Sequence, residues 1–262
     1  MALNKQLYEM IFKRKSFHLF RNIGNGHISS SEIEKINEAF DTLTPLYSDI
    51  KTAIRIVPAD ETTCKRGQEY CILLYSEKKE NYLQNIGYLG EQLDLYLVDN
   101  NIGTLWFGIG KTNEPSYKGL EFVIMIAISK VDCEAKFRKD MFKCKRKPLE
   151  EIWLGEKMEG ISDIVRFAPS ACNTQPWIVE NENNTLRVLR YKKEGKRGIM
   201  PANKVSFYNQ IDMGIFLCFL DLCLAHENIA FERKLFADSG ADAEKTLFAT
   251  YEFPFCRADI HN

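Results

Sequence analysis

A strand, a long apolar helix and a further strand follow one another twice along this chain. The first set contains the expected strand 70–75 and helix 80–101, and the second contains strand 185–191 and helix 205–226. At an offset of 127 residues, the two helices share seven identities in sixteen positions: Gly87/Gly214, Leu93/Leu220, Asp94/Asp221, Leu95/Leu222, Leu97/Leu224, Asn101/Asn228 and Ile102/Ile229. We therefore expect two related halves, residues 1–147 and 148–262, interlocked as one structural unit. The alternative is the repetition of elements that any α/β chain shows.

Hydrophobic periodicity and helix signals place the remaining elements. The expected elements are a helix at 3–13, a helix from a capping box at Ser31–Glu34 to Thr42, a buried strand at 121–128, a helix from Pro148 to Phe167, and a strand at 246–252. Together they predict an α+β fold with two pseudo-symmetric halves. Each half has a small mixed sheet flanked by helices, and the long helices meet at the interface.

Composition excludes several classes of protein. The chain has 262 residues, 45% of them hydrophobic, with 35 basic against 36 acidic side chains, so no general attraction to nucleic acid is expected. The longest apolar run is 122–128, and the second long helix is interrupted by Asp221, so neither predicts a membrane span of about 20 residues. The N-terminal segment interleaves charges with apolar residues, which favours an amphipathic helix over a secretory signal. Eight cysteines without a C-x-x-C pair or metal-ligand spacing favour reduced thiols in a cytoplasmic protein.

Two basic clusters could bind an anion. Arg14, Lys15, Ser16 and His18 follow the first expected helix, and residues 143–147 form the second cluster. Charge-assisted hydrogen bonds from Arg and Lys are strong, so either cluster could hold a phosphate. Taken alone, each could equally be a solvated turn or a linker surface.

The segment 166–177, RFAPSACNTQPW, is the most informative part of the chain. A helix is expected to end at Phe167, and a turn with two prolines flanking small and amide residues leads toward the next strand. Residues Pro169, Ser170, Ala171 and Asn173 offer a compact backbone surface with hydrogen-bond donors that can approach a flat ring closely. On the residues alone, an ordinary helix-to-strand loop with Trp177 as a core anchor stays open.

Four sequence elements resemble those of the nitroreductase family, FMN-dependent flavoproteins that oxidise NAD(P)H. APSACNTQPW resembles the family's A-P-S-x-x-N-x-Q-P-W element, and RKSFH is similar to its R-R-S-x-R opening, which binds the FMN phosphate. The residues 146–148 resemble the K-x-R-x-P phosphate element, and NIGTLWFG at 101–108 resembles the G-L-G-T-x-W-x-G loop beside the isoalloxazine ring. The resemblance implies FMN contacts at Arg14, Lys15, Ser16, His18, Lys145 and Arg146 for the phosphate side, at Trp106, Phe107 and Gly108 for the ring edge, and at Pro169, Ser170, Ala171 and Asn173 for the opposite face.

These elements are divided between the two expected halves. In the ordinary family one chain carries every element, and its A-P-S turn reaches the flavin of the partner subunit. Here the first half lacks N-x-Q-P-W in its corresponding segment 43–50, and the second half lacks G-T-x-W in its corresponding segment 228–233. The division resembles the tandem, single-chain branch of the family. It implies a monomer that acts as a pseudo-dimer with one intact FMN site.

Two positions depart from the family pattern. His18 stands where the family usually has Arg, and histidine titrates with an ordinary pKa of about 6.5, so we expect FMN affinity to weaken as pH rises. Cys144 stands where the first Lys of K-x-R-x-P would fall, and Lys143 or Lys145 could substitute.

The resemblance implies an enzyme in which bound FMN carries the chemistry. Hydride would come from NADH or NADPH and pass to a nitroaromatic, quinone or similar small acceptor. No side chain is expected to act as acid or base, and no metal is expected. Acceptor choice would depend on loops over the flavin, with 197–204 as a candidate. The alternative is a flavin-binding or flavin-storing protein of the same fold without turnover.

Overall fold

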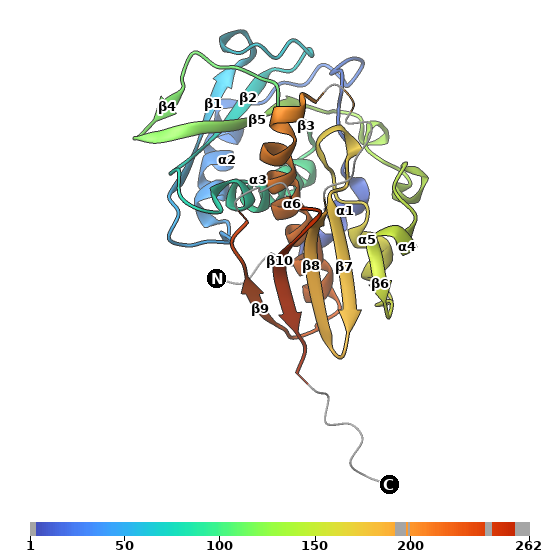
Figure 1. Ribbon diagram of the computed structural model, residues 1–262. Helices are drawn as coiled ribbons and strands as arrows, with labels where there is room; N and C mark the ends of the chain where they lie inside the picture. The colour runs from blue at the N-terminus through green and yellow to red at the C-terminus, as the bar shows by residue number, and fades with distance from the viewer. Residues whose placement is uncertain (1–3, 192–197, 199, 239–242, 255–262) are drawn as a thin grey trace.

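Two long helices cross at the centre of the molecule, between two β-sheets (Figure 1). They are α3 (Tyr82–Asp99) and α6 (Val205–His226), and nearly every residue of both is buried. The computed structural model describes residues 4–191, 198, 200–238 and 243–254. Within them, one large cluster of buried apolar side chains includes residues of both long helices and both sheets.

The first sheet lies against α3. It contains β1 (Thr52–Pro58), β2 (Tyr70–Ser76), β3 (Ile102–Phe107), β4 (Ser116–Tyr117) and β5 (Leu120–Lys130). The strand order is β1-β2-β5-β3, with β4 pairing to the end of β5, and every pairing is antiparallel. The expected mixed sheet is therefore wrong for this part of the chain, because β3 turns back against β5 after α3.

The second sheet lies against α6. It contains β6 (Trp153–Gly155), β7 (Trp177–Glu182), β8 (Thr185–Tyr191), β9 (Glu232–Leu235) and β10 (Lys245–Glu252), in the order β6-β7-β8-β10-β9. Only the short β6 runs parallel to its neighbour, so this sheet is mixed as expected. The strand predicted at 185–191 coincides with β8.

Apart from β4 and β6, the two sheets share one topology. In both, a hairpin leads into the long helix, the next strand takes the far edge, and the last strand inserts between hairpin and edge. The orders β1-β2-β5-β3 and β7-β8-β10-β9 are entirely antiparallel, and each central pairing carries one register shift. We call β1, β2, α3, β3 and β5 the first unit, and β7, β8, α6, β9 and β10 the second unit.

The two long helices touch backbone to backbone at a pair of glycines. A Cβ atom on Gly87 would lie 2.0 Å from the carbonyl oxygen of Ile211, and one on Gly214 would lie 2.0 Å from the carbonyl oxygen of Gln84. Each contact becomes the other when 127 is added to or subtracted from its residue numbers. Only glycine allows this approach, and the contact is reciprocal, as at a two-fold axis.

The shorter helices differ in part from the expectations. They are α1 (Leu7–Lys13), α2 (Ser30–Thr42), α4 (Leu149–Ile152) and α5 (Ser162–Val165), with 3₁₀ turns at Ala59–Glu61, Glu134–Lys136, Met141–Lys143, Ala171–Asn173 and Ala202–Lys204. The capping box is formed by Ser29 and Glu32, not Ser31, because the Ser29 hydroxyl is placed to accept from the Glu32 N–H.

The single helix predicted from Pro148 to Phe167 is wrong. The chain instead forms α4, β6 and α5, because Gly155 and Gly160 take left-handed conformations with φ of 86° and 71° that end each element. Trp153 is buried at the break and donates its indole N–H to the carbonyl of Glu156. Pairing with β7 therefore outweighs the local helix signals.

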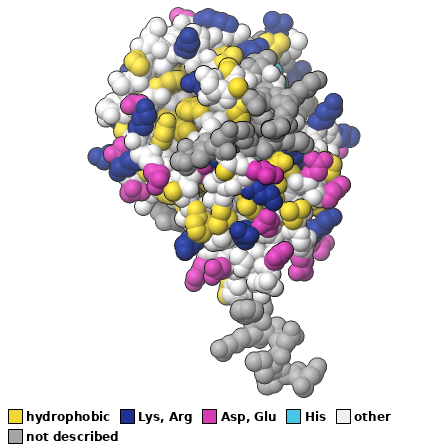
Figure 2. Space-filling model, in the orientation of Figure 1, with side chains coloured by type: hydrophobic (Ala, Val, Ile, Leu, Met, Phe, Trp, Pro, Cys, Tyr) yellow, Lys and Arg dark blue, Asp and Glu magenta, His cyan; other side chains and the backbone are white. Residues whose placement is uncertain are grey.

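One helical segment, Ala202–His226, is long and apolar enough to cross a membrane. Within its most apolar window, 94% of the residues are buried inside the protein, so this helix forms the core. On the face drawn in Figure 2, basic and acidic side chains are interspersed over the described surface.

Candidate functional site

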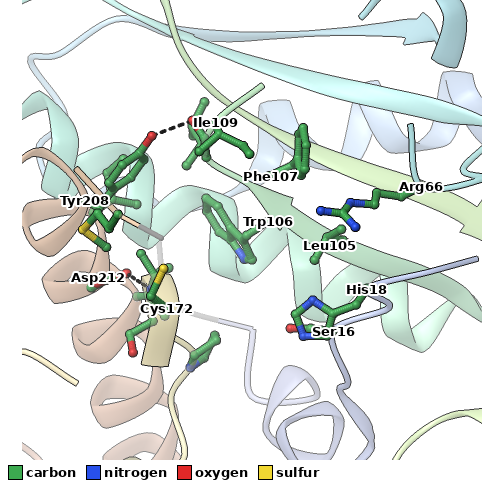
Figure 3. Close-up of a pocket in the computed structure, with 18 of the residues that line it drawn as sticks. Ser16, His18, Arg66, Leu105, Trp106, Phe107, Ile109, Cys172, Tyr208 and Asp212 are labelled. Carbon is green, nitrogen blue, oxygen red and sulfur yellow. Dashed lines mark hydrogen bonds between the residues drawn. The ribbon is translucent and has the colours of Figure 1, made fainter. Parts of the chain in front are cut away.

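A pocket of about 260 Å³ opens between the two units (Figure 3). Its lining comes from both ends of the chain: Arg14, Ser16, His18, Arg66, Leu105, Trp106, Phe107, Gly108, Ile109 and Ile124 on one side, and Pro169, Ser170, Ala171, Cys172, Met200, Tyr208, Ile211, Asp212 and Ile215 on the other. Figure 3 shows Ser16, His18 and Arg66 across the pocket from Cys172, Tyr208 and Asp212, with Trp106 between them. The pocket is therefore cationic at one end and apolar through its middle.

The N-terminal segment reaches the pocket by pairing with β3. Ser16 forms a parallel bridge with Thr104, and the Phe17 N–H donates to the Thr104 carbonyl at 2.9 Å. This backbone pairing lays Ser16 and His18 alongside the end of β3 where Trp106, Phe107 and Gly108 lie. Two elements separated by about 90 residues thus meet as the resemblance implied, although NIGTLWFG forms a strand and not a loop over most of its length.

Arg14 lies beneath the pocket and is already paired with carboxylates. It is 3% exposed, its Nε donates to Asp94 Oδ2 at 2.9 Å, and Glu91 lies 3.4 Å away. Burial opposes the charge, but Asp94 and Glu91 raise the pKa of Arg14. Burial raises the pKa of Glu91 to about 8, even though Arg14 lowers it. The indole N–H of Trp106 also donates to Asp94, at 3.0 Å.

Arg14 still has hydrogen-bonding capacity at the pocket. Its Nη2 lies 2.9 Å from Asp94 Oδ2 as an ion pair, but it makes no aligned hydrogen bond within the described residues. Its Nη1 is 3.4 Å from the Ser16 hydroxyl. An anion at this end of the pocket would meet an oriented but largely neutralised guanidinium.

Arg66 is a pocket cation that the sequence reasoning missed. It lies in the connection between β1 and β2, where its carbonyl accepts from the Phe20 N–H at 2.9 Å and its N–H donates to Gln68 at 2.9 Å. Its guanidinium carbon is 5.6 Å from the ring centroid of Phe107. The left-handed Gly67, with φ of 82°, was the sequence's only sign of a fixed turn here.

The turn after α5 forms the opposite wall and is conformationally strained. Cys172, Asn173 and Gln175 have φ of 51°, 56° and 49°, a region that costs non-glycine residues of order 1–3 kcal/mol each. The Ser170 hydroxyl accepts from the Gln175 N–H at 3.0 Å, and the Gln175 side chain accepts from the Lys147 N–H at 2.8 Å. Such a backbone persists only where several neighbours fix it.

Helix α6 supplies two polar side chains to the same wall, and both escaped the sequence reasoning. Asp212 is 2% exposed, and its Oδ1 accepts from the Ala171 N–H at 2.9 Å, while burial raises its pKa to about 8. The Tyr208 hydroxyl donates to the Gly108 carbonyl at 2.7 Å and so joins the two walls. Burial raises the pKa of Tyr208 as well.

Four residues implied by the resemblance are not among the pocket lining. The Lys15 ammonium donates to the Lys136 carbonyl at 2.9 Å, and Lys145 is exposed beside the turn. Arg146 donates to Asn173 Oδ1 at 3.1 Å and to the Phe167 carbonyl at 2.9 Å. Burial, with a contribution from Arg138, lowers the pKa of Arg146 to about 10. The structure thus brings Arg146 and Asn173 together as supports of the turn.

A second buried carboxylate occupies the corresponding place in the second unit. Asp221 lies 127 residues after Asp94, and it accepts from the hydroxyls of Tyr88 at 2.7 Å and Tyr251 at 2.6 Å. Arg233, which lies 127 residues after Trp106, donates to the same carboxylate. We call Asp221, Arg233, Tyr88 and Tyr251 the Asp221 cluster, and none of its members lines the pocket.

The arrangement suits a flat apolar ligand with an anionic end. The aromatic and aliphatic middle would pack on a ring, and Ser16, His18 and Arg66 would meet an anion. In the described part of the chain, no group of three or more His, Cys, Asp or Glu side chains could hold a metal ion. Of the candidate loop 197–204, residues 197 and 199 lie outside the described residues, while Met200 lines the pocket.

Comparison with known proteins gives one family. A family model described as "Putative TM nitroreductase" matches residues 6–224. A "putative nitroreductase" from Thermotoga maritima MSB8 is similar with a TM-score of 0.61 and 17% identity, over 97% of this chain and 94% of that chain. A "putative nitroreductase in complex with FMN" from Desulfovibrio desulfuricans gives a TM-score of 0.42 and 16% identity, over 58% of this chain and 97% of that chain. No curated protein sequence matches.

Proposed function

Since this chain belongs to the nitroreductase family described as "Putative TM nitroreductase", we propose that it is an FMN-dependent oxidoreductase. Its hydride donor would be NADH or NADPH, and its acceptor a nitroaromatic, a quinone or a similar small molecule. The observation that carries this proposal is the pocket itself. The RKSFH segment and the APSACN turn, 150 residues apart, face each other across one apolar cavity.

The pocket residues fit the two ends of FMN. The apolar middle, with Leu105, Trp106 and Ile211, suits an isoalloxazine ring, and the turn at 169–172 offers backbone close to its face. The cationic end suits the phosphate, with Ser16, His18 and Arg66 as the side chains not already paired to a carboxylate. This set differs from the one implied by the resemblance, in which Arg14, Lys15 and Arg146 provide most of the charge.

Bound FMN would supply the redox chemistry, accepting hydride from the nicotinamide and giving it to the acceptor. The chain's residues would bind and orient. Arg66 and His18 would attract the phosphate, Asp94 would hold Arg14 and Trp106 in place, and Tyr208 would keep the two walls together through Gly108. The side chains of Ile109 and Met200 would exclude water from the ring. No side chain is assigned as an acid or base.

We also propose that the chain is a fused pair of related units with one flavin site. Support comes from the shared strand order, from the reciprocal contacts of Gly87 and Gly214, and from the paired positions of Asp94 and Asp221. The Asp221 cluster fills the space that the pocket occupies in the other unit. A monomeric, pseudo-dimeric protein without nucleic-acid or membrane partners follows from this proposal.

A cytoplasmic location is proposed with it. All seven cysteines that the structure describes have free thiols, which suits a reducing compartment. The partner would be a small electron acceptor.

Purified protein tests the proposal directly. We expect flavin absorbance in the isolated protein or after addition of FMN, with one FMN per chain by titration and a monomer in analytical ultracentrifugation. With FMN bound, NADH or NADPH should be consumed when menadione or a nitrofuran is added. FMN binding without oxidation of either nicotinamide would favour a flavin-binding or flavin-storing protein. No binding at any pH, or two FMN per chain, would overturn the site.

A further inference from the structure

Asp212 holds the flavin-facing turn through one backbone contact. Its Oδ1 accepts from the Ala171 N–H at 2.9 Å, and its Oδ2 lies 3.4 Å from the Thr174 hydroxyl. The side chain is buried and also lines the pocket. Removing this acceptor would leave a buried N–H unpaired next to three left-handed residues.

The first unit contains the same contact with a different side chain. Asn85 lies 127 residues before Asp212 on α3, is fully buried, and its Oδ1 accepts from the Tyr47 N–H at 2.9 Å. Tyr47 lies in segment 43–50, the counterpart of the APSACN turn. An uncharged amide therefore suffices to hold a turn in this place, so the carboxyl group of Asp212 is not required for the hydrogen bond alone.

The surroundings of Asp212 do not stabilise a negative charge. Within the described residues no Lys, Arg or His lies within ion-pairing distance of it. The groups that face it are Cys172 from the turn, Tyr208 one turn earlier on α6, and Arg14, His18 and Arg66 across the pocket. The Ala171 and Thr174 hydrogen bonds favour the charge, but burial outweighs them and raises the pKa to about 8.

We propose that Asp212 positions the turn at 170–173 and that its proton controls the affinity of the pocket for FMN. This inference rests on the proposed function. The neutral acid keeps its acceptor for Ala171 and can donate a hydrogen bond into the pocket. The ionised form places an unpaired negative charge beside an anionic ligand, and binding would bury that charge further. FMN affinity should therefore fall as Asp212 loses its proton.

The test measures the dissociation constant of FMN by flavin fluorescence from pH 7 to pH 9, where the phosphate charge is constant. For the wild type we expect an approximately tenfold loss of affinity across this range. Asp212→Asn should keep FMN binding near its neutral-pH strength and remove most of the loss. Equal pH profiles for the two proteins, or an equally weak Asp212→Asn at every pH, would overturn the proposal.

Matched variants separate other causes. Glu91 also has a pKa near 8, so Glu91→Gln should retain the pH-dependent loss; a flat profile there would assign the effect to Glu91 instead. Asn85→Asp adds a carboxyl group at the counterpart position and should leave the profile unchanged. His18→Gln removes the other titrating side chain at the pocket, and the loss above pH 7 should persist in it.

Stability without flavin gives an independent readout. Because the folded-state pKa of Asp212 lies above its ordinary value of 3.8, ionisation destabilises the folded protein, and this loss grows as pH rises toward and through about 8. Thermal unfolding of Asp212→Asn should depend less on pH between 6 and 9 than that of the wild type. If FMN binds but neither readout changes, this inference fails and the proposed function stands; if FMN never binds, the proposed function fails first.

Discussion

Asp94 and Asp221 occupy corresponding places on α3 and α6, yet their surroundings have opposite consequences. Asp94 binds Arg14 and Trp106 beneath an open pocket, whereas Asp221 binds Arg233, Tyr88 and Tyr251 in a filled interior. The side chains 12 residues after the two aspartates, Trp106 and Arg233, both hydrogen-bond the carboxylate. The comparison teaches that one backbone arrangement can present either a ligand site or a core, depending on a few side chains.

The largest effect should come from removing what the two units share. Gly87→Ala and Gly214→Ala each place a methyl group 2.0 Å from a backbone carbonyl oxygen that cannot move without shifting a helix. We expect each to lower the free energy of unfolding by more than about 4 kcal/mol, measured by urea denaturation. Glu38→Ala on the exposed face of α2 is the control. A loss under 1 kcal/mol at either glycine would contradict the close crossing.

The next prediction breaks the Asp221 cluster. Arg233→Leu leaves a buried carboxylate without its cation, and we expect a loss of about 2–4 kcal/mol, less than for a fully buried pair because Arg233 is 20% exposed. Burial already raises the pKa of Asp221, so without Arg233 the loss should grow as pH rises from 5 to 8.5.

The double variant Asp221→Asn/Arg233→Leu is the control for that prediction. Thermal unfolding should show it to be more stable than Arg233→Leu alone at pH 8, since no charge remains buried. A double variant that is less stable would mean that the carboxylate has another role.

A third prediction concerns the open pocket. Arg66→Ala removes a cation that no carboxylate neutralises among the described residues, and it should weaken FMN binding by about 10- to 100-fold, the value of a charge-assisted hydrogen bond of about 1.5–3 kcal/mol. Fluorescence titration measures this. Arg187→Ala on β8, where Arg187 pairs with Glu180 at the surface, is the matched loss of charge. Equal effects of the two would indicate a general electrostatic field and not a site.

The smallest effect should come from the bond that joins the two walls. Tyr208→Phe removes a hydroxyl that donates to the Gly108 carbonyl, and we expect a loss of about 0.5–1.5 kcal/mol in urea denaturation. Tyr96→Phe removes a hydroxyl that makes no hydrogen bond to the described part of the chain, and it should change nothing. If the two variants match, Tyr208 does not tie the walls together.

The elements predicted well from the sequence were those with strong apolar runs. The strand 185–191 was predicted to the residue, and the two long helices within two residues at each end, because their side chains are buried on every face. Edge strands were missed: β1 and β9 are partly exposed, and β9 reads Glu-Arg-Lys-Leu, a charged segment that only pairing with β10 makes a strand. The helix predicted over 148–167 failed because sheet pairing outweighed local propensity.

The candidate site was only partly accessible to sequence reasoning. Short motifs located Ser16, Trp106 and the turn at 169–172, which the structure places around one pocket. Arg66 and Asp212 carried no motif. One lies in a loop and the other in an apolar helix, so their approach to the pocket depends on contacts between distant segments. The pairing of Arg14 with Asp94 likewise joins residues 80 positions apart.

The glycine crossing also has a consequence for how the chain is made. Residues 84–87 must wait for residues 211–214 before α3 can cover its apolar surface. At synthesis rates of roughly 5–20 residues per second, those 127 residues take about 6–25 s. For that time the emerging chain exposes a sticky helix with its partner still unsynthesised. Folding should therefore be slow and dependent on chaperones, and translation pauses before α6 should increase aggregation.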